Sequence, residues 1–357
     1  MKAVVITSPG GPEVLQSQEV DDPAVGDEEV LIEVAAAALN RADTLQRKGS
    51  YPPPNGASPY PGLECSGTII AVGKYVTRWK VGDQVCALLS GGGYAEKVAA
   101  LAGQVLPLPP GVSLRDAASF PEVACTVWST VFMTSRLSPG ESFLIHGGSS
   151  GIGTFAIQMA KHLGIRVFVT AGLVMLIGKR NKLVVHTRLI RFMINMLNSA
   201  HFLGTEEKLA ACKQLGADIC INYKTEDFVA RVKEETAGKG VDVILDNIGA
   251  PYLQRNLDSL NIDGRLFIIG FQGGTVTQVN LSCLLAKRLT LQAAGLRNRS
   301  PENKAVIVGE VEKNVWPAIA AGKVKPVVCK SFPLSEAAEA HRLMESSAHI
   351  GKILLIP

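Results

Sequence analysis

The chain has 357 residues, of which 47% are hydrophobic and 19% are charged. This composition supplies enough apolar surface for a large buried core and excludes an intrinsically disordered chain, while the length predicts two domains of roughly 150 residues each. The N-terminus lacks the pattern of a cleavable signal peptide, and no apolar stretch reaches the roughly 18 residues of a membrane span. We therefore expect no membrane partner.

Residues 1–122 read as strands separated by turns. Apolar or alternating runs are bounded by glycine and proline, which predicts strands over Ala3–Ile6, Glu29–Ala36, Gly67–Val72, Asp83–Leu88 and Tyr94–Val98. The close and regular spacing of these runs is typical of a small β-barrel. Ser113, with Asp116 three residues later, predicts the start of a helix at the end of this region.

From about Cys125 the pattern changes to alternating helices and apolar strands. The predicted strands are Ser142–Ile145, Arg166–Thr170, Asp218–Ile221, Val241–Asp246 and Arg265–Ile269. Continuous apolar strands between helices indicate a parallel sheet that is covered on both faces. After about Ala293 the chain is expected to return to the first domain and to end in the strand Lys352–Ile356.

A glycine-rich stretch, FLIHGGSSGIGT at residues 143–154, lies at the centre of this second region. An apolar strand leads into a tight loop, and a helix with small and apolar residues follows. Glycines at 148, 151 and 153 let the backbone turn sharply and approach a ligand, while free N–H groups at the helix start attract a pyrophosphate. A second apolar strand follows within about 30 residues, so the stretch predicts a dinucleotide site.

The seven cysteines are odd in number and form no CxxC pair: Cys65, Cys86, Cys125, Cys212, Cys220, Cys283 and Cys329. They are interpreted as reduced core residues, which favours a cytoplasmic protein.

Six motifs in order give the chain a family resemblance: ALNRAD (38–43), PGLECSG (61–67), HGGSSGIGT (146–154), INYK (221–224), LDNIG (245–249) and GKILL (351–355). Together they resemble the medium-chain dehydrogenase/reductases, and more narrowly the zinc-free quinone oxidoreductases related to zeta-crystallin, especially the tumour-suppressor-inducible branch. The resemblance implies a GroES-like β-barrel catalytic domain at 1–122 and 293–357 and a Rossmann domain with a doubly wound parallel sheet at 123–292. It also implies NADPH, a homodimer joined through Rossmann sheet edges, and hydride transfer to a quinone or an activated alkene.

A catalytic metal is not expected. Zinc-dependent relatives carry a histidine at the position of Leu63 and a cysteine near that of Asn40, and neither residue here supplies the nitrogen or sulfur ligands that zinc prefers. Alcohol oxidation would then lack the Lewis acid that stabilises an alkoxide. An electron-poor quinone accepts hydride without one when it is positioned over the nicotinamide and hydrogen-bonded.

Three residues are candidates for the catalytic site by their match to the family: Asn40, Asp43 and Tyr51. Tyr51 offers an aromatic face and a phenol to a ring substrate. Structural alternatives stay open, because Asn40 is equally suited to stabilising a turn, Asp43 to capping a helix and Tyr51 to packing beside the prolines that follow it.

The resemblance places a larger set of residues against the cofactor: Thr126, Gly148, Ser149, Ser150, Gly151, Ile152, Gly153, Gly172, Thr205, Lys208, Tyr223, Asn247 and Gly270. The second strand of the βαβ unit ends in Val-Thr-Ala-Gly without the acid that accepts from an NAD ribose, so NADPH is favoured. Thr126 could instead bond its own helix backbone, and Lys208 could be a solvated helix charge. His146 is interpreted as a buried histidine with satisfied hydrogen bonds rather than a catalytic one.

Residues 173–204 interrupt the family pattern. This segment holds five basic residues and no acidic one, so the remaining chain carries 31 basic and 32 acidic residues and the net charge of +4 originates here. Three interpretations compete: a basic amphipathic helix for a membrane or nucleic acid, an elaborated loop, or translated non-coding sequence such as a retained intron. We favour the last, because charge clusters interrupt every apolar run, and expect no nucleic-acid partner.

The sequence therefore predicts a zinc-free NADPH-dependent quinone reductase. The rival activity on the same fold is an enone or enoyl reductase. A non-enzymatic alternative is a nucleotide-binding or crystallin-like protein, or a catalytically impaired splice form that retains the fold.

Overall fold

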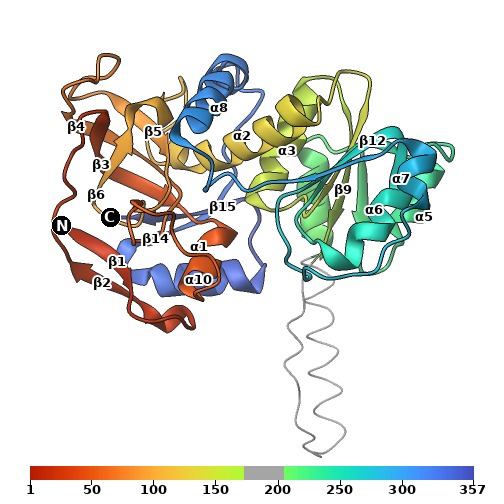
Figure 1. Cartoon of the computed structure of the whole chain (residues 1–357), viewed down its shortest axis with the longest axis horizontal. Coiled ribbons are helices and arrows are strands. Elements are labelled where there is room, and N and C mark those ends of the chain that lie inside the picture. The colour runs from red at the N-terminus through yellow and green to blue at the C-terminus, as the bar shows by residue number, and fades with distance from the viewer. Residues whose placement is uncertain (173–204) are drawn as a thin grey trace, which may run out of the picture.

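The computed structural model describes residues 1–172 and 205–357, which form two lobes (Figure 1). One lobe is built from β-strands and contains both termini, and the other is a parallel sheet flanked by helices. The predicted insertion at 173–204 lies outside the described residues. Within the described part of the chain, no helix combines the length and the apolar character that crossing a membrane requires.

The parallel sheet contains six strands in the order β10-β9-β8-β11-β12-β13, and all its pairings are parallel. They span β8 (Ser142–His146), β9 (Arg166–Ala171), β10 (Ile219–Asn222), β11 (Val241–Asp246), β12 (Leu260–Ile268) and β13 (Thr290–Ala293). The order reverses at β8, as in a doubly wound dinucleotide-binding fold. The predicted α/β class is thus confirmed.

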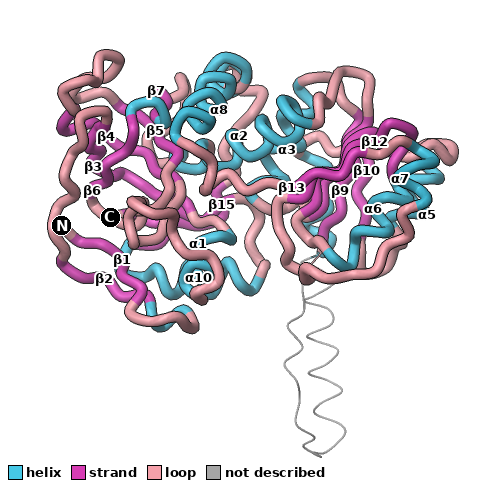
Figure 2. Tube along the Cα trace, in the orientation of Figure 1, coloured by secondary structure: helices cyan, strands magenta, loops and turns pink. Residues whose placement is uncertain are grey.

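Helices cover both faces of this sheet, as the apolar strands predicted. The helix α3 (Gly151–His162) packs on one face, against Phe143 and Val167. The other face is covered by α5 (Phe228–Glu235) and α6 (Leu253–Ser259), with α7 (Ser282–Lys287) beside them. Figure 2 shows these three helices on the side of the sheet away from the β-rich lobe. A further helix covers residues 205–214.

The β-rich lobe is held by a sheet of seven strands drawn from both ends of the chain. They are β3 (Glu29–Ala38), β4 (Glu64–Val72), β5 (Gln84–Leu88), β6 (Lys97–Leu101), β7 (Val105–Pro107), β14 (Val328–Pro333) and β15 (Lys352–Ile356). A hairpin of β1 (Lys2–Ile6) and β2 (Leu15–Glu19) lies beside it, with the helices α1 (Arg41–Arg47) and α10 (Ala337–Ser346). The predicted C-terminal strand is confirmed and pairs with β3.

Two local predictions need correction, and one strand was not predicted. The strand expected at Tyr94–Val98 begins at Lys97, because Tyr94 turns inward and its hydroxyl donates to Asp43. The predicted helix start at Ser113 is capped as expected, yet only a 3-10 turn at Asp116–Ser119 follows it. The edge strand β13 was missed because all four of its residues are exposed, so it shows no buried pattern.

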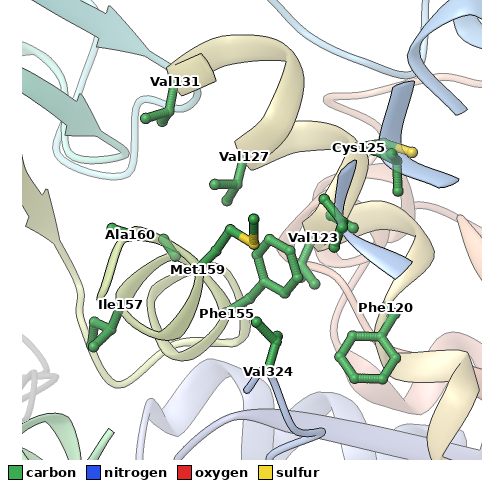
Figure 3. Packing of buried hydrophobic residues seen from close by; sticks show 14 of the residues in the cluster. Phe120, Val123, Cys125, Val127, Val131, Phe155, Ile157, Met159, Ala160 and Val324 are labelled. Atoms are coloured by element: carbon green, nitrogen blue, oxygen red, sulfur yellow. The ribbon is translucent and has the colours of Figure 1, made fainter. Parts of the chain in front are cut away.

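The two lobes share a hydrophobic core around α2 (Pro121–Val127), which packs against α3. Figure 3 shows side chains of the two helices facing each other. Phe120 makes edge contacts with both Phe155 and Trp316, at centroid distances of 6.4 and 6.5 Å. Trp316 begins α9 (Trp316–Ala320), directly after α8 (Pro301–Asn314). Since aromatic contacts cross between the lobes, α2 is held firmly beside the glycine-rich loop.

Candidate dinucleotide and substrate site

The glycine-rich loop joins β8 to α3 and leaves no room for side chains at two of its positions. A Cβ atom at Gly153 would lie 2.4 Å from the carbonyl oxygens of both Gly147 and Gly148, and one at Gly148 would lie 2.8 Å from Cβ of Val169. Gly147 has a φ of 75°, which favours glycine. Ser150 caps α3 by accepting from the Gly153 amide. Helix and strand therefore meet as closely as a dinucleotide cradle requires.

Gly151 has a different neighbour from the one expected. A Cβ atom there would lie 2.4 Å from Cδ of Lys352, so this glycine makes room for a lysine side chain rather than for an open approach to the loop. The start of β15 is also tied to the loop, because the Gly351 amide donates to the Ser149 carbonyl at 2.9 Å. The C-terminal strand thus borders the candidate cofactor site.

Asn247 and Gly270 follow the carboxyl ends of the neighbouring strands β11 and β12. The Asn247 side chain packs against the glycine-rich loop, because its amide nitrogen lies 3.1 Å from the position that a Cβ atom at Gly147 would take. Its oxygen Oδ1 is buried and has no hydrogen-bond partner among the described residues. Because buried acceptors are normally satisfied, this atom fits a donor such as a ribose hydroxyl or carboxamide of a bound dinucleotide.

On the adenosine side the structure brings Gly172 and Tyr223 together. A Cβ atom at Gly172 would lie 2.7 Å from the Tyr223 ring, and burial raises the pKa of that phenol to about 12. Lys208 is only 3% exposed, which excludes a solvated charge, and its ammonium donates to the Ser347 carbonyl. Thr205, at the start of the same helix, is buried as well.

His146 is a satisfied core residue, as interpreted. Its ring nitrogens lie 2.9 Å from the Thr170 hydroxyl and 2.7 Å from Oδ1 of Asn256. Burial lowers its pKa to about 4, so the ring is neutral at neutral pH. It carries no chemistry at the loop.

Asp43 has the capping role that the sequence left open. Its carboxylate accepts from the amides of Asn40 at 2.8 Å and Gly62 at 3.2 Å, and from the Tyr94 hydroxyl at 3.0 Å. The side chain is completely buried, which raises its pKa to about 6. Asp43 therefore fixes the start of α1 and the orientation of Asn40.

Asn40 belongs to a buried charged cluster that the sequence did not reveal. Nζ of Lys352 lies 2.5 Å from Oε1 of Glu64, 2.8 Å from Oδ1 of Asn40 and 2.9 Å from the Leu39 carbonyl. The Asn40 amide nitrogen also donates to Glu64 at 2.9 Å. Both charged residues lie within the quoted motifs, but nothing in their spacing indicated that they pair.

Glu122, which the sequence analysis also did not identify, extends this cluster towards Thr126 and Tyr51. Its backbone amide donates to Oε2 of Glu64 at 2.9 Å, and its carboxylate accepts from the Thr126 hydroxyl at 3.0 Å. The Thr126 side chain therefore bonds a carboxylate, not the helix backbone. Burial raises the pKa of Glu122 to about 7, helped by the negative charge of Glu64 and opposed by Lys352.

Tyr51 is held by Arg297 as well as by its own loop. The guanidinium donates to the Tyr51 carbonyl at 3.2 Å and lies 5.3 Å from the ring centroid. Burial raises the pKa of the phenol, and the charge of Glu122 contributes to this rise. Tyr51, Glu122 and Asn40 thus border one region between the lobes.

Among the described residues, no group of three or more His, Cys, Asp or Glu side chains is arranged to hold a metal ion. Leu63 is buried beside Glu64.

Residues 26–110 match the alcohol dehydrogenase GroES-like domain, and residues 215–355 match the zinc-binding dehydrogenase family. The chain is 32% identical to quinone oxidoreductase 1 of Escherichia coli, over 98% of this chain and 97% of that protein. It is 30% identical to a 2-haloacrylate reductase of a Burkholderia species, over 99% and 98%.

A solved structure of Escherichia coli quinone oxidoreductase complexed with NADPH superposes with a TM-score of 0.82 at 31% identity, covering all of both chains. The β-rich lobe is therefore a GroES-like domain, and the parallel sheet is Rossmann-like.

Proposed function

Because the chain belongs to the quinone oxidoreductase-like family of the medium-chain dehydrogenase/reductases, we propose that it is an NADPH-dependent quinone reductase that works without zinc. The observation that carries the proposal is the glycine cradle with the unsatisfied Asn247 oxygen at the switch point of the sheet. The motifs ALNRAD and PGLECSG further support the zinc-free branch related to zeta-crystallin, closest to the tumour-suppressor-inducible members.

NADPH is supported by the chain's own residues. No acid follows β9 to repel a 2'-phosphate, and the buried ammonium of Lys208 has donors beyond the one given to Ser347. We assign the cofactor to the thirteen positions expected from the family, with the adenosine beside the packed pair Gly172 and Tyr223 and the nicotinamide towards Thr126. The bound cofactor would supply the hydride.

In this proposal the acceptor binds in the region bordered by Asn40, Tyr51 and Glu122. Tyr51 offers its ring to a flat substrate, and Asn40 is held rigidly by Lys352 and Glu64. Asp43 serves as a positioning residue behind Asn40. A quinone needs orientation and hydrogen bonds rather than a Lewis acid, which agrees with Leu63 in place of a ligand.

An alkene acceptor is the second candidate, and the Burkholderia 2-haloacrylate reductase supports it. Both reactions add hydride and a proton to an electron-poor π-system. A steady-state panel of small quinones and alkenals with NADPH separates them, because a quinone reductase turns over the quinones with the higher kcat/KM. Turnover of the alkenals alone would favour the enone or enoyl reductase.

We further propose a homodimer joined through β13. All four residues of this edge strand are exposed, and the helix α7 shortly before it in the chain has exposed leucines, Leu281 at its N-cap (62%) and Leu285 within it (87%). An unpaired edge next to apolar side chains is suited to pairing with a second copy. A cytoplasmic location is proposed because all seven cysteines are free.

A catalytically impaired splice form that keeps the fold is the non-enzymatic alternative, because residues 173–204 interrupt the adenosine side of the site in sequence. If NADPH binds without turnover of any acceptor while a variant lacking 173–204 is active, the enzyme assignment belongs to the shorter form. Comparison of the transcript with its gene tests directly whether these codons are intronic.

A further inference from the structure

The proposed reduction requires a proton as well as a hydride. Hydride addition to a quinone gives a hydroquinone monoanion, and addition to an enone gives an enolate. Each anion is completed by one proton, which a nearby acid delivers faster than bulk water does. None of the roles proposed above supplies this acid.

Three carboxylates lie around the charged cluster, and two of them are sealed. Asp43 and Glu64 are 0% exposed. Asp43 accepts three hydrogen bonds, and Glu64 is paired with Lys352 and with two amide donors. Neither can reach an acceptor without breaking a buried network, which is costly. Both are structural groups.

Glu122 differs in position and in partners. It lies in the first turn of α2, is only partly buried, and its carboxylate accepts one hydrogen bond from the described residues, that of the Thr126 hydroxyl. Its backbone is fixed by the bond from its amide to Glu64. The backbone of Glu122 is therefore fixed, and Oε2 of its carboxylate accepts no hydrogen bond from the described residues.

The charged and titratable groups that face Glu122 come from five elements. Lys352 begins β15, Glu64 begins β4, Asp43 lies in α1, Tyr51 lies in the loop after α1, and Cys125 lies one turn along α2. Among the described residues, the negative charges of Glu64 and Asp43 oppose a further negative charge on Glu122, and the positive charge of Lys352 favours it. A carboxyl group in this place is driven towards its neutral form, which is the form that donates.

We infer that Glu122 is the acid that protonates the reduced acceptor, an inference that rests on the proposed reductase function. Two electrons and one hydrogen pass from the nicotinamide to the acceptor as hydride. The carboxyl O–H bond of Glu122 then breaks, and the proton forms the O–H bond of the hydroquinone or the C–H bond of the saturated product. Water reprotonates the carboxylate through its partly open side.

The ionisation of Glu122 supports this role, since its pKa of about 7 leaves a large protonated fraction at neutral pH. A kcat that depends on the neutral carboxyl falls as pH rises through this value. Tyr51 is a weaker candidate because burial raises its pKa further above that of an ordinary phenol.

The test compares Glu122→Gln and Glu122→Asp with the wild-type full chain. Glu336→Gln, at an exposed position with no side-chain bond, is the matched control. With NADPH and benzoquinone we expect Glu122→Gln to lower kcat by at least about tenfold and to lose the fall in kcat above about pH 7. Glu122→Asp should retain part of the rate, and NADPH affinity by calorimetry should be unchanged in both.

Infrared difference spectra provide a readout without cofactor. We expect a protonated carboxyl band in the wild-type chain that titrates near pH 7 and is absent in Glu122→Gln. If the wild-type chain is active and Glu122→Gln has the same kcat and the same pH profile, this inference is overturned while the proposed reductase function stands. If neither the wild-type chain nor the form lacking 173–204 reduces any quinone or alkene, the proposed function is contradicted and the inference falls with it.

Discussion

Nζ of Lys352 lies 2.5 Å from Oε1 of Glu64, although the two residues are 288 positions apart in the chain. The pair joins the first residue of β15 to the first residue of β4, and both side chains are almost completely buried. Lys352 also bonds Asn40 and passes over Gly151. One buried ion pair thus connects the C-terminal strand, the candidate catalytic asparagine and the glycine-rich loop.

Lys352→Met should destabilise the chain strongly, because it leaves the buried carboxylate of Glu64 without its cation. A loss of about 3–5 kcal/mol is expected for such a broken pair. The double variant Lys352→Met/Glu64→Gln should recover part of it. Thermal unfolding of the wild-type chain and the two variants measures this. Equal midpoints for the wild-type chain and Lys352→Met would show that the ion pair does not stabilise the fold.

Gly153→Ala should disturb the fold of the loop, since its Cβ would lie 2.4 Å from two backbone oxygens that cannot move independently. We expect a loss of about 2–4 kcal/mol and weaker NADPH binding. Gly309→Ala is the control. Gly309 lies in α8 with nothing within 4 Å of its Cβ position, so alanine should stabilise the helix by about 0.5–1 kcal/mol. Similar denaturation midpoints for both variants would contradict the packing argument.

Gly151→Val should weaken NADPH binding. The new side chain would also contact Lys352, a neighbour of Gly151 that the sequence did not indicate. The new side chain meets the flexible end of Lys352, so we expect the lysine to shift and the fold to survive. The effect on folding should therefore be smaller than that of Gly153→Ala. Unchanged cofactor affinity in the folded variant would remove Gly151 from the site.

Lys208→Met should discriminate between the two nicotinamide cofactors. Loss of an ammonium that contacts a 2'-phosphate should raise the Kd for NADPH about tenfold and leave the weaker Kd for NADH unchanged. Lys213→Met is the control, because Lys213 lies one to two turns further along and donates to the Asp218 carbonyl. Parallel changes for NADPH and NADH in calorimetry would indicate that Lys208 only anchors Ser347.

Leu285→Arg should give a monomer if β13 and α7 form the dimer interface. The leucine is 87% exposed, so the substitution removes no intramolecular packing. Val306→Arg, at an exposed position of α8, should leave the dimer intact. Light scattering after size exclusion reports both masses, and an unchanged dimer in Leu285→Arg would place the interface elsewhere.

Deletion of residues 173–204 should tighten NADPH binding, improve solubility and raise turnover. The deletion joins Gly172 directly to Thr205 and restores the close sequence connection between the end of β9 and the helix that carries Lys208. A long loop adds only a slowly growing closure cost, so both forms should fold. Equal NADPH affinity of the two forms, measured on monodisperse protein, would show that the segment is a tolerated elaboration.

The sequence by itself determined the α/β class, most strands of the parallel sheet and the position of the glycine-rich loop. Strands such as Val241–Asp246 and Lys352–Ile356 were predicted with their observed bounds, because each contains a run of consecutive apolar residues, Val243–Leu245 and Ile353–Ile356, that is typical of a buried strand. The capping function of Asp43 and the satisfied state of His146 were also among the interpretations that local chemistry allowed. These features depend on neighbours in the chain or on burial alone.

Only the tertiary structure decided how the charged side chains pair. Lys352, Glu64 and Glu122 are distant in sequence, and their hydrogen bonds depend on the C-terminal strand crossing back beside β3 and on α2 packing between the lobes. The exposed strand β13 escaped detection for a related reason, since pairing with β12 and not a local pattern makes it a strand. Burial raises the pKa of Glu122, and the charges of the distant residues Glu64 and Lys352 adjust it, so no periodicity in the chain encodes this ionisation.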